Sequence, residues 1–126
     1  MRHCGYTLDM ISQELIDWVE RQSDKLNRYF PVATKREALF GRVAKLTEEV
    51  GELAEAILAS ERLQRQEKLD GADSAHEAVE DIGAECADVI ITTLLLAQQT
   101  GVDMNQAITN KIAKIDARFE KIEKGE

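Results

Sequence analysis

Apolar residues recur along the chain at alternating steps of three and four, the spacing of one face of an amphipathic helix. The clearest stripe comprises Leu39, Val43, Leu46, Val50, Leu53 and Ile57. In front of it, Thr34 and Glu37 match the capping box, a pattern in which both side chains bond to free backbone amides at a helix start. The pattern therefore predicts one long helix from Lys35 to about Gln66.

A shorter helix is predicted before this one, from an N-cap at Thr7 to about Leu26. Pro31 ends the pattern, because the residue before a proline is pushed out of the helical region. The helix carries an apolar stripe of Leu8, Ile11, Leu15, Trp18 and Val19. Aromatic residues in such positions usually pack in a core, so core positions are also expected for Trp18, Tyr29 and Phe30.

Two more helices are predicted in the second half of the chain. After a loop at residues 69–73, Ser74 and Glu77 form a second capping box, and Gly101 marks the end of that helix near Thr100. Asp103 caps the last helix. Its expected core stripe is Ile108, Ile112, Ile115, Phe119 and Ile122.

Beside these helices no strand pattern and no internal repeat is found, so the predicted fold class is all-α, a four- to five-helix bundle. The chain has 126 residues with 1 Pro and 44% apolar residues, which suits a single helical domain over residues 1–126 and argues against disorder. The segment from Val89 to Ala97 is apolar around the whole helix. Such a segment lies at the centre of a bundle or in an interface between subunits.

The net charge of −8 makes nucleic acid and anionic membrane surfaces unfavourable partners, because both attract clustered Lys and Arg. Residues 89–97 span about half of what crosses a bilayer. Two cysteines, Cys4 and Cys86, are too few for a disulfide framework, and the first ten residues lack the apolar core of a signal peptide. A reducing, cytoplasmic location is therefore expected.

Acidic residues form two stripes within this pattern. Glu48, Glu49 and Glu52 lie within roughly a 100° arc of the long helix. On the third predicted helix, one face carries Glu77, Asp81, Glu85 and Asp88. Between residues 69 and 110 there is no Lys or Arg, so local salt bridges do not explain the second stripe.

If the two helices pair, Glu49 and Glu52 meet Glu85 and Asp88 in an oxygen-only site of the kind that Mg²⁺ or Mn²⁺ accepts, whereas zinc prefers nearby His and Cys. Among these acids, Asp88 has the clearest need for a compensating charge. It stands directly before Val89, where an uncompensated buried carboxylate would cost several kcal/mol. The alternative is that these acids are ordinary solvated helix faces.

The segment Glu48-Glu49-Val50-Gly51-Glu52-Leu53, followed by Glu85-Cys86-Ala87-Asp88-Val89, resembles the EExxE and ExxD signature of the MazG-like, all-α nucleoside triphosphate pyrophosphohydrolases. The resemblance extends from about residue 34 to residue 118. It departs from the family pattern in the long gap between the two motifs. The resemblance implies that Glu49, Glu52, Glu85 and Asp88 hold Mg²⁺, with Mn²⁺ as a possible substitute, and that Glu48 helps to activate the attacking water.

The reaction implied by the resemblance is hydrolysis of a nucleoside or deoxynucleoside triphosphate between its α- and β-phosphates, which gives a monophosphate and pyrophosphate. Basic and polar residues on the last helix are candidate phosphate or sugar contacts, although they are equally an ordinary surface: Lys111, Lys114, Arg118 and Asn110. The resemblance and the apolar half of the third helix both predict a homodimer or homotetramer.

Two other functions fit the same residues. Phosphoribosyl-ATP pyrophosphohydrolases share the fold and the metal motif and differ in substrate contacts. A non-catalytic helical interaction protein would use its apolar stripes for coiled-coil-like pairing. Dependence on Mg²⁺ separates the enzymes from the interaction protein.

Overall fold

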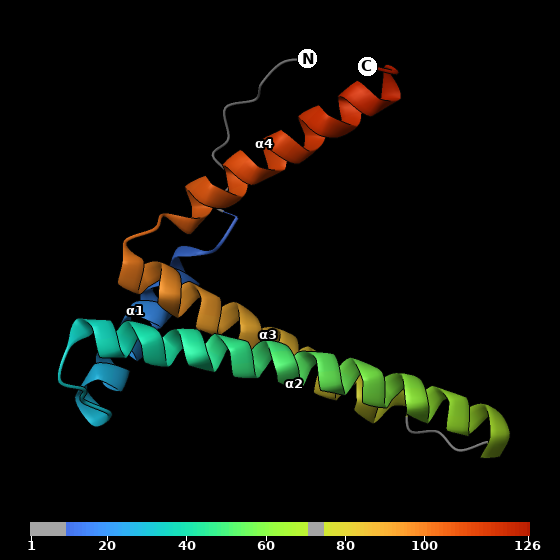
Figure 1. The fold of residues 1–126 in the computed structure, drawn as a ribbon, viewed down its shortest axis with the longest axis horizontal. Helices are drawn as coiled ribbons and strands as arrows, with labels where there is room; N and C mark the ends of the chain where they lie inside the picture. Colours follow the sequence, from blue (N-terminus) through green and yellow to red (C-terminus); the bar gives the residue numbers. More distant parts are fainter. Residues whose placement is uncertain (1–9, 71–74) are drawn as a thin grey trace.

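The structure is a computed structural model that describes residues 10–70 and 75–126 (Figure 1). In these residues the chain forms four helices, α1 (Gln13–Tyr29), α2 (Lys35–Asp70), α3 (Ala75–Thr100) and α4 (Met104–Glu123). The described residues contain no strand. The predicted all-α class with four helices is therefore confirmed.

The first helix begins later than predicted. Residues 10–12 are not helical, and α1 starts at Gln13 after Ser12, whose Oγ accepts a hydrogen bond of 3.2 Å from the Leu15 amide. The predicted start after Thr7 is thus wrong, because the serine supplies the cap closer to the helix; Thr7 itself lies outside the described residues. The helix ends at Tyr29, two residues before Pro31.

The capping box of α2 forms as predicted. The Glu37 amide donates to Thr34 Oγ1 at 3.1 Å, and Glu37 Oε2 accepts from the Ala33 amide, also at 3.1 Å. The helix continues to Asp70, so residues 69 and 70 are helical rather than part of the predicted loop. The rest of that loop and the predicted cap at Ser74 lie outside the described residues.

The turn between α3 and α4 depends on Gly101, whose φ of 74° lies in the left-handed region that favours glycine. In this turn the Val102 amide donates to the Ala97 carbonyl at 2.9 Å. Asp103 then caps α4 by accepting from the Gln106 amide at 3.0 Å. Both boundaries agree with the sequence prediction.

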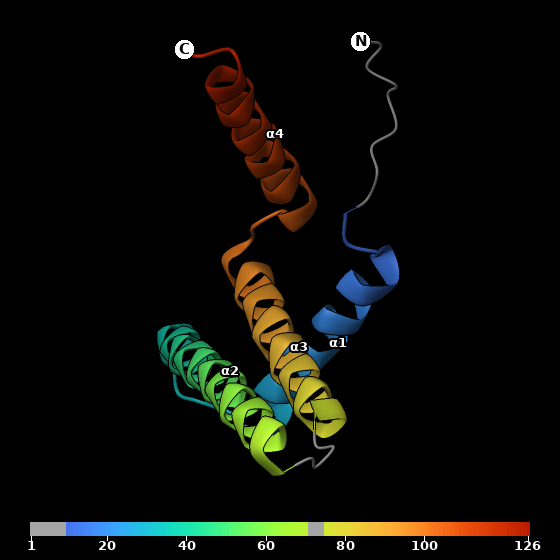
Figure 2. The same ribbon diagram turned by 90° about the vertical axis from the view of Figure 1, so that its right-hand side faces the viewer.

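The α2 and α3 helices lie side by side in opposite directions, and α1 packs across α3 (Figures 1 and 2). The core between α1 and α3 is built on Val19, Leu94 and Leu95. By contrast, α4 extends away from the α2–α3 pair. No described helix is long and apolar enough to cross a membrane.

One side chain links the three packed helices. The Arg42 guanidinium of α2 donates to Ser23 Oγ at 3.0 Å and to Asn27 Oδ1 at 3.3 Å, both on α1. It also donates to the Leu95 carbonyl of α3 at 3.5 Å. Because these bonds come from one planar group, they fix how the three helices meet beside the core.

Several residues predicted as core are exposed instead. Tyr29 and Phe30 are 68% and 74% exposed, and on α4 Phe119 and Ile122 are 56% and 61% exposed. Ile90, in the all-round apolar half of α3, is 56% exposed. The core prediction is wrong for Tyr29, Phe30, Phe119 and Ile122 because, in the described chain, no other element covers their faces. The exposure of Ile90 rules out the centre of a bundle within one chain and leaves the subunit interface as a prediction.

Replacing Leu94 by alanine should destabilise the protein by about 2–5 kcal/mol, because it leaves a cavity in the α1–α3 core. Urea unfolding followed by circular dichroism measures this change. The same substitution at Leu58, which is 58% exposed on α2, is the matched control and should change stability by less than about 0.5 kcal/mol. Equal losses for both variants would contradict the assigned core.

Candidate metal centre

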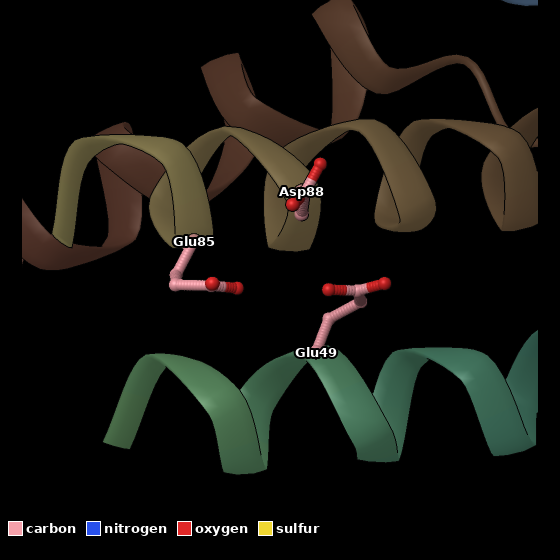
Figure 3. Close-up of side chains that lie close together, drawn as sticks. All are labelled: Glu49, Glu85 and Asp88. Carbon is pink, nitrogen blue, oxygen red and sulfur yellow. The ribbon is translucent and has the colours of Figure 1, made fainter. Parts of the chain in front are cut away.

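Carboxylates from α2 and α3 face one another across the antiparallel pair. Figure 3 shows Glu49 pointing from α2 toward α3, and Glu85 and Asp88 pointing back from α3. One oxygen from each of the three side chains lies within 4.8 Å of the others. This spacing allows a single cation to contact all three carboxylates.

The three carboxylates differ in their access to water. Glu49 is only 5% exposed, Glu85 is partly buried and Asp88 is exposed. Within the described part of the chain, neither Glu49 Oε2 nor Glu85 Oε2 has a hydrogen-bond partner. Buried polar atoms without a partner are costly and uncommon, so these two oxygens fit a site completed by a cation.

The expectation that Asp88 would be the buried acid is wrong. Asp88 is exposed at the edge of the helix pair, and Glu49 takes the buried position. The reason lies in the apolar stripe of α2: position 49 is three residues after Leu46 and four before Leu53, on the face that packs against α3. Its neighbours on that face therefore determine the burial of Glu49.

Lys45 is a member of the site that the sequence analysis did not assign. Its Nζ lies 2.7 Å from Glu49 Oε1 and 3.1 Å from Glu48 Oε1. Hydrogen bonds to Glu49 and Glu48 raise the pKa of Lys45 above its ordinary value. The signal was present in the sequence, since a lysine three and four residues before two glutamates lies beside both on a helix.

Glu52, the fourth predicted ligand, is exposed and lies outside the group of three. Partial desolvation and then the charges of Glu49 and Glu85 raise the pKa of Glu52 above its ordinary value. The carboxylate of Glu52 therefore interacts electrostatically with carboxylates of both α2 and α3. Its role as a ligand stays a prediction, as does the role of Glu48, which is exposed and paired with Lys45.

The basic residues predicted to contact phosphate do not meet the carboxylates within one chain. All of them are exposed on α4, which extends away from the α2–α3 pair (Figures 1 and 2): Asn110, Lys111, Lys114 and Arg118. The Asn110 side chain accepts a hydrogen bond of 2.8 Å from Gln106 of the same helix. A single copy of the chain therefore presents an acidic site without nearby α4 cations.

The fold and the site together define a class: an all-α domain whose antiparallel helices hold a carboxylate cluster suited to a divalent cation. Residues 41–122 match the family described as the MazG nucleotide pyrophosphohydrolase domain. The chain therefore belongs to this family, as its two acidic motifs predicted. No curated protein and no solved structure matches the chain significantly.

Replacing Glu52 by glutamine should raise the melting temperature of the metal-free protein at neutral pH. Because the pKa of Glu52 is raised on folding, its contribution favours folding below the ordinary glutamate pKa and is lost as the pH rises through the raised value. The increase in melting temperature should therefore disappear near pH 4, where glutamate takes up its proton.

Thermal unfolding in EDTA at both pH values tests this expectation. Glu55→Gln is the control, because Glu55 is exposed on the same helix and three residues away. If Glu52→Gln lowered the melting temperature at neutral pH, the repulsion described for this cluster would be refuted.

Proposed function

We propose that the protein is a Mg²⁺-dependent hydrolase that converts nucleoside or deoxynucleoside triphosphates to monophosphate and pyrophosphate. The observation that carries this proposal is the convergence of Glu49, Glu85 and Asp88, with two carboxylate oxygens lacking any partner in the described chain. Membership of a nucleotide pyrophosphohydrolase family supports the reaction class.

The donor set fits a hard divalent cation. Mg²⁺ and Mn²⁺ prefer carboxylate oxygens, and the site offers three of them, with Glu52 beside the group as the proposed fourth ligand. When bound, the cation would offset the negative charge of the phosphates and polarise the attacking water. This explains how a chain with a net charge of −8 would bind an anionic substrate.

The remaining residues of the site have proposed roles that follow from their positions. Glu48 is exposed beside the cluster and would accept the proton of the attacking water. Lys45 bonds to both Glu48 and Glu49, so it would hold the proposed base and the buried ligand in a fixed relation. Water would reach the site at Asp88, which is exposed at the edge of the helix pair.

We further propose that the chain acts as a homo-oligomer. The apolar stripe of α4 and Ile90 of α3 are uncovered in one copy, and burying them against a second copy would stabilise the assembly. Contacts from Lys111, Lys114, Asn110 and Arg118 to phosphate remain a prediction that a single chain does not satisfy, because α4 points away from the carboxylates of the same chain.

The packing of α1 against α3 supports one domain over the whole chain, although the family match begins within α2. The free thiol of Cys86 fits the proposed reducing cytoplasm. Phosphoribosyl-ATP remains the alternative substrate, because the same carboxylates would serve either triphosphate.

The reaction is tested by incubating the purified protein with a panel of NTPs, dNTPs and phosphoribosyl-ATP in the presence of Mg²⁺. The expected products are a monophosphate and pyrophosphate, separated by ion-exchange chromatography, and EDTA should abolish their formation. Release of orthophosphate with a diphosphate would contradict cleavage between the α- and β-phosphates.

Glu49→Gln and Asp88→Asn should each lower turnover by more than about 100-fold, since even residues that only support metal ligands cost 10–100-fold. Circular dichroism should show unchanged helix content. Glu55→Gln, which removes an exposed charge outside the cluster, should retain full turnover. Turnover at the wild-type rate in Glu49→Gln or Asp88→Asn would overturn the assignment of these ligands.

A further inference from the structure

Among the described residues, the hydrogen bonds that join α4 to the rest of the fold lie at its beginning. Asn105 Oδ1 accepts from the Ile11 amide at 2.7 Å, and Asn105 Nδ2 donates to the Ile11 carbonyl at 3.2 Å. Met104 packs against the core. Beyond this first turn, every residue of α4 except Ile108 is exposed, and the helix extends away from α2 and α3 (Figure 2).

The uncovered stripe of α4 follows a heptad repeat. Its members alternate between the two apolar positions, called a and d, with Ile112 and Phe119 at a and Ile108, Ile115 and Ile122 at d. Ile115 and Phe119 are 39% and 56% exposed. A helix with such a seam buries it against another helix, because exposed apolar side chains in a continuous row are unfavourable in water.

The charged residues next to this seam are sorted by sign. One flank, position g, carries Lys111 and Arg118, and the other flank, position e, carries Asp116 and Glu123. In the part of the chain that the structure describes, none of these four forms an ion pair. Each flank of the seam therefore carries charges of one sign, and ion pairs within α4 do not neutralise them.

The charge pattern distinguishes the two ways in which two copies of α4 can pair. In a parallel pair, each g residue lies beside the e residue five positions later in the other helix. Lys111 then faces Asp116 of the second copy, and Arg118 faces Glu123 of the second copy. In an antiparallel pair the g flanks face each other, as do the e flanks, so every flanking contact joins like charges.

We infer that α4 pairs in parallel with α4 of a second copy of this chain through its Ile and Phe seam, with ion pairs from Lys111 to Asp116 and from Arg118 to Glu123. The second copy is the occupant that fits, because the same helix carries both the seam and the complementary flanks. The inference rests on the proposed self-association and specifies its surface and orientation.

This pairing gives Lys111 and Arg118 a role other than the predicted phosphate contact. Lys114 and Lys121 occupy position c, on the outer side of the helix, and remain exposed in the pair. The carboxylates of α2 and α3 take no part in the seam. Self-association can therefore be measured without nucleotide or metal, independently of hydrolysis.

The association is measured by light scattering after size-exclusion chromatography. The wild type should elute at a multiple of the 14.1 kDa chain mass. Lys111→Glu with Arg118→Glu should weaken association by about tenfold or more, because four ion pairs of a pair of helices become like-charge contacts. Adding Asp116→Lys and Glu123→Lys to that variant should restore the association, because each flanking contact again joins opposite charges.

The matched control is Lys114→Glu with Lys121→Glu, which makes the same change in net charge on the outer face of α4. It should leave the association unchanged. An equal loss in both double variants would show a general effect of charge and overturn the pairing. A monomeric wild type would overturn it as well, whether or not the protein hydrolyses nucleotides, whereas an inactive oligomer paired in this way would fail only the proposed function.

Orientation is tested by disulfide crosslinking in a chain with Cys4→Ser and Cys86→Ser. Under mild oxidation, a mixture of Ile108→Cys and differently tagged Phe119→Cys chains should give disulfides between like chains, because parallel pairing places each residue beside its own copy, whereas antiparallel pairing places position 108 beside position 119. Disulfides mainly between the two different chains would show antiparallel pairing and refute the inference. Failure of both variants to crosslink while the protein remains oligomeric would show that another surface holds the assembly.

Discussion

The structure depends on a balance between apolar packing and carboxylate repulsion along the α2–α3 pair. The same face of α2 carries Leu46, Leu53 and the buried Glu49, so the packing that joins the helices also brings Glu49 against Glu85 and Asp88. Lys45 supplies one positive charge against three carboxylates. A divalent cation would neutralise the remaining negative charge. The packing of α2 against α3 thus creates the site that the proposed chemistry needs.

A single copy of the chain leaves two kinds of surface unsatisfied. In residues 10–70 and 75–126, the carboxylate site has oxygens without hydrogen-bond partners, and no helix covers the apolar seam of α4. The anchor at Asn105 fixes where α4 leaves the core, so the direction of the helix is determined while its seam stays available. A cation and a second copy would satisfy these two surfaces independently.

Local signals in the sequence predicted most of the fold. The caps at Thr34 and Asp103 and the glycine at position 101 each act on a few neighbouring residues, and their predicted helix ends are confirmed. Each of these signals follows from spacing within one helix. Of the four carboxylates expected to meet across α2 and α3, the structure brings together Glu49, Glu85 and Asp88, while Glu52 lies outside the group.

The errors concern burial, which depends on distant parts of the chain. The sequence could not show that Glu49 rather than Asp88 would be covered, because this depends on how deeply α3 packs against α2. The apolar stripe of α4 is present as predicted, but it is exposed in the described chain, because periodicity alone does not show whether another element covers it. The two motifs contain acidic positions alone, so they did not indicate that Lys45 would pair with Glu48 and Glu49.

Calorimetric titration of the metal-free protein with Mg²⁺ tests whether Glu49, Glu85 and Asp88 bind a divalent cation. We expect saturable binding by the wild type, loss of that binding in Glu85→Gln, and undiminished binding in the control Glu55→Gln. Equal binding by the wild type and Glu85→Gln, or no binding by the wild type, would contradict this expectation.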